Sequence, residues 1–272
     1  VGSDEIIDLL IRIFCEPRLD SVVILEPTYG VYRVAADVND ITVNSSLLTD
    51  EFQIDLDDVH QKSDANTKLI FCCSPNNPTG NLLQRQDILD LCAMTQAVVV
   101  VDEAYVDFAG TESLIGAISR FPNLVVLRTL SKAWGLAAIR LGYALAHPLI
   151  VSYLMKAKAP YNINALTSME ALKALERTEH LQQSVASTTA ERKRLVGELE
   201  RVACVQRVFP SDANFLLVRV TDARTLHQRL AQRGVIVRDR SSEPKLANCI
   251  RISVGTPGEN DTLLTVLKEF EE

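Results

Sequence analysis

Short apolar runs, separated by stretches of helical periodicity, fill the first half of the chain. Four of these runs contain almost no polar residue, as is typical of parallel strands that are buried on both faces. These predicted strands cover residues 22–25, 69–73, 98–101 and 124–127. Helices are expected at residues 4–15, where apolar side chains recur at helical spacing, and at residues 86–95. The alternation predicts an α/β domain with a mostly parallel sheet, flanked by helices and joined by right-handed crossovers.

The pattern changes after about Asn164. A long helix with a highly charged face is expected over residues 180–203, followed by a mixture of short strands and helices. The later strands are predicted at residues 214–220, 235–237 and 249–254, with a helix at 223–233 and a closing helix that ends at Phe270. This order predicts a smaller α+β domain. We therefore divide the chain into a large domain, residues 1–173, and a small C-terminal domain, residues 174–272.

Composition and charge narrow the class of protein. Hydrophobic residues make up 47% and charged residues 23% of the 272 residues, which is ordinary for a globular protein. The net charge is −7 and the charges are scattered, so without a basic stripe we expect no nucleic-acid partner. The longest apolar runs have the length of a strand, so we expect no membrane partner.

The cysteines and histidines change this picture little. The six cysteines form no C-x-x-C pair, and most lie in apolar segments where a thiol behaves as a small hydrophobic group. This usage fits a reducing, cytoplasmic location. The four histidines lack the spacing of metal ligands, so no metal is expected.

Polar segments follow three of the predicted strands at their carboxyl ends. Considered singly, Lys132 is a surface lysine, Asp102 caps a helix, and residues 76–80 form a plain turn. Their combination favours one pocket, because ligands of open α/β sheets bind beyond the carboxyl ends of the strands. The three segments are Ser74-Pro75-Asn76-Asn77-Pro78-Thr79-Gly80, Asp102-Glu103-Ala104-Tyr105 and Arg128-Thr129-Leu130-Ser131-Lys132.

These motifs, in this order, resemble the fold-type I aminotransferases that depend on pyridoxal 5′-phosphate (PLP), most closely the class II-like histidinol-phosphate branch. The similarity covers nearly the whole chain and is more specific for the superfamily than for the branch. It implies a fold-type I large domain that binds PLP. The further matching blocks are Gly2-Ser3-Asp4-Glu5, Glu26-Pro27-Thr28-Tyr29-Gly30, Ile139-Arg140-Leu141-Gly142, Val237-Arg238-Asp239 and Ile250-Arg251-Ile252-Ser253-Val254-Gly255.

The resemblance implies a role for each polar residue around the cofactor. Lys132 would hold PLP as a Schiff base and carry a proton during the reaction, while Asp102 would keep the pyridine nitrogen protonated. Tyr29 would stack on the ring, and Asn77 and Tyr105 would bond its 3′ oxygen. The phosphate would lie at the start of the first helix, where its remaining contacts would come from Ser3, Asp4, Thr129, Ser131 and Arg140.

Two late arginines imply the substrate. Arg251 resembles the arginine that binds the substrate α-carboxylate across the superfamily, and Arg238 resembles the additional arginine of the histidinol-phosphate branch. A phosphate ester with three oxygens favours two guanidinium groups over one. The alternative for Arg238 is an ion pair with Asp239 or another surface acid. The implied enzyme is a homodimer that transfers the amino group of histidinol phosphate to 2-oxoglutarate by a ping-pong mechanism, giving imidazole-acetol phosphate and glutamate in histidine biosynthesis.

Some features depart from the family pattern. The chain begins inside the first matching block, so we expect that it lacks the N-terminal segment that covers the site in this family. That lack predicts an exposed apolar face on the small domain. Arg18 stands where the family usually has glycine, which predicts that the turn after the first helix is not left-handed.

Other functions on the same scaffold remain open. An aromatic aminotransferase or a threonine-phosphate decarboxylase would keep the cofactor residues and change the substrate pocket. A non-catalytic PLP-sensing module, as in aminotransferase-like transcription regulators, would carry a DNA-binding domain before this region. The sequence upstream of Val1 would distinguish the enzyme from the regulator.

Overall fold

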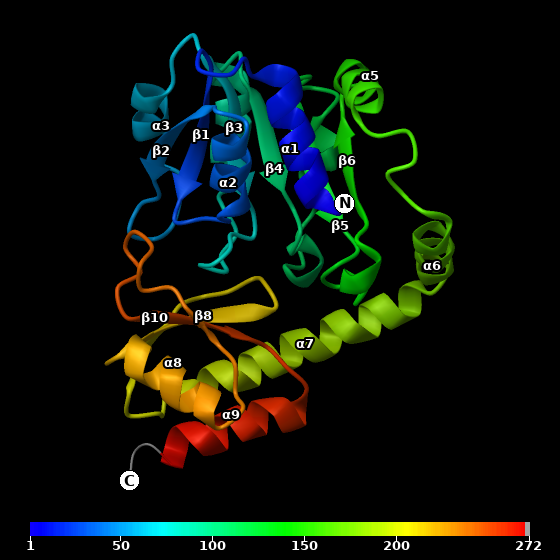
Figure 1. Ribbon diagram of the computed structural model, residues 1–272. Coiled ribbons are helices and arrows are strands. Elements are labelled where there is room, and N and C mark those ends of the chain that lie inside the picture. The colour runs from blue at the N-terminus through cyan, green and yellow to red at the C-terminus, as the bar shows by residue number, and fades with distance from the viewer. Residues whose placement is uncertain (270–272) are drawn as a thin grey trace.

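The computed structural model describes residues 1–269, and Phe270, where the last helix was expected to end, lies outside that range. Figure 1 shows a larger sheet above a smaller one. The larger sheet has the strand order β2-β1-β3-β4-β5-β6. All neighbouring strands in it run parallel except β5 and β6, which are antiparallel. The strands are β1 (Ser21–Glu26), β2 (Thr42–Leu47), β3 (Thr67–Cys73), β4 (Val98–Asp102), β5 (Leu124–Thr129) and β6 (Gly142–Ala146).

The central strands are apolar along their length because both of their faces are covered. Successive side chains of a strand point to opposite faces. Phe71 and Val100 therefore belong to the cluster that α1, α2 and α5 cover, whereas Ile70 and Val99 belong to the cluster that α3 and α4 cover. The covering helices are α1 (Ser3–Phe14), α2 (Val31–Val38), α3 (Leu56–Lys62), α4 (Arg85–Met94) and α5 (Pro148–Ala157).

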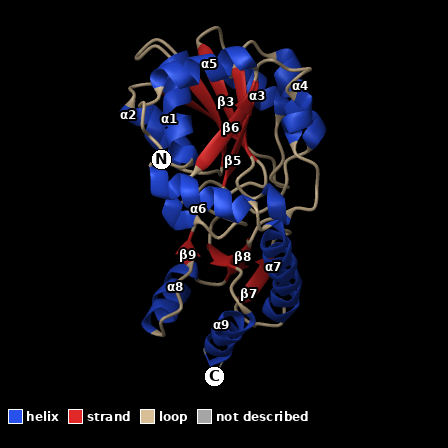
Figure 2. Cartoon of the chain, turned by 90° about the vertical axis from the view of Figure 1, so that its right-hand side faces the viewer, coloured by secondary structure: helices blue, strands red, loops and turns tan. Residues whose placement is uncertain are grey.

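The smaller sheet is antiparallel and has the order β7-β8-β10-β9. One face packs against three helices through residues such as Leu216 and Val218. The other face contributes Leu217 to a cluster that it shares with the larger sheet. Figure 2 shows the three helices beside this sheet. The three helices are α7 (Thr178–Leu199), α8 (Ala223–Gln232) and α9 (Pro257–Glu269), and a shorter helix, α6 (Ala165–Leu175), precedes α7. The strands are β7 (Val205–Val208), β8 (Phe215–Val220), β9 (Arg238–Asp239) and β10 (Cys249–Ser253).

The structure confirms the α/β fold with a mostly parallel, helix-flanked sheet and an α+β C-terminal part. The prediction of a strand at residues 235–237 is wrong, since β9, the strand that pairs with β10, begins at Arg238. Val235 instead donates its backbone N–H to the carbonyl of Leu230 at 2.9 Å and so closes the end of α8. The long helix ends at Leu199, because the chain turns through residues 200–204 into β7. The division between residues 173 and 174 falls within α6 and stays a prediction.

The expectation for the turn at Arg18 is also wrong. Arg18 has a φ of 64°, which is left-handed. Its backbone N–H donates to the carbonyl of Asp40 at 2.9 Å, and its Nε donates to the Asp40 carboxylate at 2.5 Å. These two bonds hold a conformation that glycine would adopt without strain.

Half of the exposed large apolar side chains among the described residues lie on α5, α6 and the segment between them, and the apolar face expected on the small domain is not observed. Among the described residues beyond α6, Ile236 is the one large apolar side chain that is well exposed. No helix within residues 1–269 has the length and apolar character needed to cross a membrane. The exposed members of the α5–α6 surface are Leu149, Tyr153, Met155, Tyr161, Leu166, Met169, Leu172 and Leu175.

The start of α1 lies directly against Gly142, the first residue of β6. A Cβ atom at Gly142 would be 2.3 Å from the backbone nitrogen of Ser3 and 2.7 Å from the carbonyl carbon of Gly2. Gly142→Ala should therefore lower the free energy of unfolding by about 1–3 kcal/mol, as overpacking does elsewhere. Urea unfolding followed by circular dichroism measures this.

Gly197→Ala is the matched control for that substitution. Gly197 lies within α7, and nothing is found within 4 Å of a Cβ atom placed there. Alanine should raise stability by about 0.5–1 kcal/mol at this helical position. Equal stability of the Gly142→Ala variant and the unaltered protein would show that α1 can shift freely.

Candidate active site

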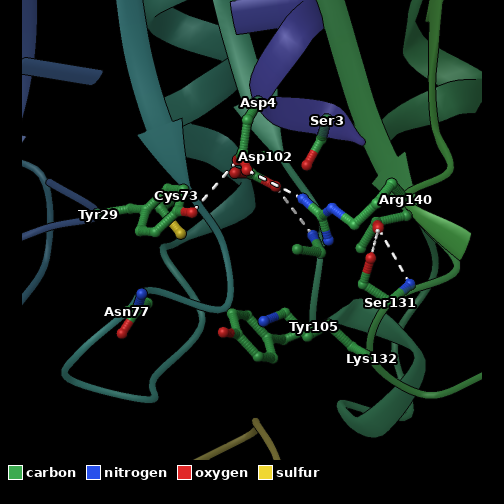
Figure 3. A pocket seen from close by; sticks show the side chains of 12 residues that line it. Ser3, Asp4, Tyr29, Cys73, Asn77, Asp102, Tyr105, Ser131, Lys132 and Arg140 are labelled. Atoms are coloured by element: carbon green, nitrogen blue, oxygen red, sulfur yellow. Dashed lines mark hydrogen bonds and ion pairs between the residues drawn. The ribbon is translucent and has the colours of Figure 1, made fainter. Parts of the chain in front are cut away.

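The carboxyl ends of the central strands meet the start of α1 at one edge of the larger sheet. Cys73 at the end of β3 pairs with Asp102 at the end of β4, and Asp102 pairs with Leu127 of β5. Figure 3 shows side chains from these ends turned toward one pocket. The described residues that line it are Ser3, Asp4, Tyr29, Cys73, Asn77, Asp102, Ala104, Tyr105, Thr129, Ser131, Lys132 and Arg140. The pocket thus unites Lys132 with every residue expected at the cofactor, whereas Arg238 and Arg251 lie outside its lining.

Asp102 is a buried carboxylate whose two oxygens are each held by a donor. The hydroxyl of Tyr32 donates to Oδ2 at 2.9 Å, and the backbone N–H of Ala104 donates to Oδ1 at 3.1 Å. Burial raises the pKa of Asp102 to about 6, and the bond from Tyr32 partly opposes this rise. A buried anion of this kind favours a nearby cation, such as a protonated ring nitrogen.

Tyr32 is a site residue that the sequence did not identify. It comes from α2 and is fully buried, with its ring stacked on Phe71 at 4.8 Å between centroids. A second tyrosine three residues after the matched Tyr29 was the available signal, although Tyr29 itself precedes α2. Two further residues of the lining were not singled out: Cys73 ends the predicted strand at residues 69–73, and Ala104 lies within the motif that begins at Asp102.

Lys132 lines the pocket and remains accessible to solvent. Its Nζ is 5.1 Å from the centroid of the Tyr105 ring. Crowding by protein atoms lowers the pKa of Lys132, and the positive charge of Arg251 lowers it further, while Asp102 opposes the change. A lowered pKa increases the fraction of neutral amine, which is the nucleophilic form.

The first turn of α1 forms an anion site with Arg140. Gly2 precedes the helix with a φ of 75° and donates its N–H to the carbonyl of Arg140 at 2.8 Å. A Cβ atom at Gly2 would be 2.9 Å from Nη2 of Arg140, so the missing side chain leaves room for the guanidinium group. The unpaired N–H groups of a first helical turn suit a phosphate. Thr129 and Ser131 add two hydroxyls, whose oxygens are 3.0 Å apart.

The two asparagines of the turn after β3 have different environments. Asn76 is buried and donates to the carbonyl of Pro27 and to the hydroxyl of Thr79, both at 2.8 Å. Asn77 lines the pocket, and its Oδ1 accepts a hydrogen bond from Nη1 of Arg251. Arg251, on β10, therefore meets the pocket from the small domain.

Arg238 and Arg251 lie opposite each other in neighbouring strands of the small sheet. The guanidinium of Arg251 is 5.0 Å from the ring centroid of Phe215, and burial lowers the pKa of Arg251, with Arg238 contributing to the decrease. Within residues 1–269, Arg238 has no ion-pair partner, so the alternative of a pair with Asp239 is not observed. Asp239 instead accepts bonds from the N–H and the hydroxyl of Ser241.

The chemistry of the donor set fits a planar, phosphorylated aromatic cofactor. The pocket combines a buried carboxylate, two tyrosines, a primary amine and an anion site at a helix start. The room at Gly2 and Gly142 lets the helix start approach the pocket, since a side chain at either would strike its backbone or Arg140. No group of three His, Cys, Asp or Glu residues in the described part of the chain could hold a metal ion.

Comparisons with known proteins agree with this site. The model of aminotransferase class I and II matches residues 1–267. A histidinol-phosphate aminotransferase of Parabacteroides distasonis is 47% identical over 99% of this chain and 78% of its own length. That of Flavobacterium psychrophilum is 45% identical over 98% of this chain and 77% of its own length.

Solved structures agree as well. The crystal structure of the histidinol-phosphate aminotransferase from Clostridium acetobutylicum is similar with a TM-score of 0.92 and 27% identity, over 99% of this chain and 82% of that one. An L-threonine-O-3-phosphate decarboxylase from Porphyromonas gingivalis has a TM-score of 0.84 and 25% identity, over 99% of this chain and 82% of that one. The protein therefore belongs to the class I and II aminotransferases, among the histidinol-phosphate aminotransferases.

Proposed function

We propose that the protein transfers the amino group of histidinol phosphate to 2-oxoglutarate, in histidine biosynthesis, with pyridoxal 5′-phosphate as its cofactor. The observation that carries this proposal is that one pocket is lined by both the buried Asp102 and the amine of Lys132, next to the start of α1 and Arg140. When bound, the cofactor would supply a conjugated ring that accepts the electron pair left when the substrate loses its Cα proton.

The residues of the large domain would bind and orient the cofactor. Lys132 would hold it through the amine and afterwards move the proton at the substrate Cα. Asp102 would hold a proton on the ring nitrogen, since its charge is buried and would otherwise lack a cation. Tyr29 would cover the ring, while Asn77 and Tyr105 would donate to its 3′ oxygen. The phosphate would be bound by the N–H groups of Ser3 and Asp4, the hydroxyls of Thr129 and Ser131, and Arg140.

The small domain would supply the substrate contacts. Arg251 would bind the α-carboxylate of glutamate and the phosphate of histidinol phosphate in turn, as a ping-pong mechanism requires. Arg238 has no acidic partner in the described chain. It lies directly opposite Arg251 in the neighbouring strand, so it would add a second guanidinium for the phosphate. The relatives at 45–47% identity favour this substrate over threonine phosphate, whose decarboxylase is 25% identical.

A homodimer in the cytoplasm is part of the same proposal. Tyr161 is 93% exposed, and it lies between two helices that carry further exposed apolar side chains. An apolar surface of this extent typically marks a protein interface. Sedimentation as a monomer at micromolar concentration would contradict the dimer without affecting the proposed reaction.

The substrate assignment is tested by separating the two half-reactions. Arg251→Ala should impair both, because both substrates would place an anion there. Arg238→Ala should impair the histidinol-phosphate half-reaction about tenfold more than the glutamate half-reaction, since a charge-assisted hydrogen bond contributes about 1.5–3 kcal/mol. Single-turnover absorbance measurements give kcat/KM for each half-reaction.

Arg201→Ala is the control for these arginine variants. Its side chain is 74% exposed, on the small domain, and pairs with Glu198. It should leave both half-reactions unchanged. Equal losses for both substrates in Arg238→Ala would remove the argument for a phosphate substrate and leave the transaminase without an assigned specificity.

The role of the buried carboxylate is tested with two variants. Asp102→Asn should retain cofactor binding but lower kcat by much more than tenfold, because the ring nitrogen would lose its counter-ion. Loss of an ordinary hydrogen bond, about 0.5–1.5 kcal/mol, accounts for at most about tenfold. Tyr32→Phe removes one hydrogen-bond donor to Asp102 and keeps the charge of the carboxylate. The kcat of this variant should therefore fall by no more than about tenfold. The reverse ranking of the two variants would mean that the charge of Asp102 is not essential.

A further inference from the structure

One carboxylate joins two parts of the cofactor pocket that are far apart in the sequence. Oδ1 of Asp4 accepts a hydrogen bond from the hydroxyl of Tyr29 at 3.2 Å. Oδ2 of the same side chain accepts one from Nη2 of Arg140 at 3.3 Å. Figure 3 shows Asp4 between these two partners, with a dashed line to each. The family resemblance assigned Asp4 to the phosphate, without a separate role for its side chain.

The two partners would act on different ends of the cofactor. Under the proposed function, Tyr29 covers the ring and Arg140 binds the phosphate. Within the described chain, the Tyr29 hydroxyl has no other hydrogen-bond acceptor. Burial raises the pKa of Tyr29, and the neighbouring charge of Asp4 adds to that rise, so the phenol keeps its proton and remains a donor.

Arg140 needs an orienting contact because its side chain is long and 44% exposed. Its backbone is left-handed, with a φ of 54°, and is fixed by the bond from Gly2. Its Nη1 donates to the carbonyl of Ala137 at 3.2 Å, and Nη2 donates to Asp4. With these two atoms held, the remaining N–H groups of the guanidinium are available to a phosphate.

We propose that the Asp4 side chain is a positioning residue that aligns Tyr29 with the cofactor ring and Arg140 with its phosphate. This inference rests on the proposed function. A carboxylate beside a phosphate also repels it, but here water screens the repulsion, because the Asp4 side chain is 39% exposed. The start of α1 and Arg140 both oppose it with positive charge. We therefore expect the alignment of Tyr29 and Arg140 by Asp4 to strengthen cofactor binding more than the repulsion between Asp4 and the phosphate weakens it.

The same carboxylate also contributes to the charge balance at Lys132. Four charged groups act on that amine, two arginines that lower its pKa and two aspartates that raise it. They are Arg251, Arg140, Asp102 and Asp4. Removal of the charge of Asp4 should move the titration of the Lys132-bound cofactor to lower pH. A substitution that only loosened the fold would have no reason to move it in that direction.

The test measures PLP binding to cofactor-free protein by titration of the visible absorbance and circular dichroism. Asp4→Asn should weaken binding about tenfold, reduce the visible circular dichroism of the bound ring and lower the pH of its titration. Asp8→Asn is the matched control, because Asp8 lies on the same helix and also bridges two residues, Arg12 and Asn39, away from the pocket. It should change none of the three quantities.

A double-mutant cycle keeps the test decisive even if Asp4→Asn lowers stability. Tyr29→Phe removes one of the two contacts and should produce part of the loss, and Asp4→Asn should have a smaller effect in that background. Unchanged binding in Asp4→Asn would overturn the inference, and tighter binding would identify Asp4 as a competing anion instead. If the unaltered protein fails to bind PLP, the proposed function fails, and not this inference alone.

Discussion

The parallel pairing of β3, β4 and β5 is the constraint on which the site depends. Because their register aligns Cys73 with Asp102, and Asp102 with Leu127, the polar segments that follow the three strands emerge side by side. Helices cover both faces of the sheet, so a ligand can reach it at the strand ends and not at a face. The antiparallel strand β6 then brings Gly142 against the start of α1, which adds the backbone N–H groups of a helix start to the same edge.

The two carboxylates at that edge are held in different ways. Asp102 is buried under the pocket with Tyr32 as donor, while Asp4 is paired with Arg140 at the surface. Lys132 lies within the influence of both acids and of two arginines, and surrounding protein atoms lower its pKa more than any one of these charges does. The smaller sheet adds Arg251 through its bond to Asn77, which connects the proposed substrate contact to a proposed cofactor residue.

Features that depend on consecutive residues could be predicted from the sequence. Buried strands, the turn with Asn77 and the segment ending in Lys132 are each defined by a short run of residues. Features that depend on tertiary packing could not. Tyr32 reaches Asp102 only because α2 packs over β3. Val235 lies outside the expected strand and donates its N–H to the carbonyl of Leu230 at the end of α8. The left-handed Arg18 depends likewise on Asp40, a residue distant in the sequence.

The central claim is that the amine of Lys132 is the group that holds the cofactor. The direct measurement is borohydride reduction of the protein with bound PLP, followed by peptide mapping of the pyridoxyl group. The account predicts one modified peptide, with the group on Lys132, and loss of that peptide in Lys132→Ala. A pyridoxyl group on another lysine of the unaltered protein, with Lys132 unmodified, would contradict it.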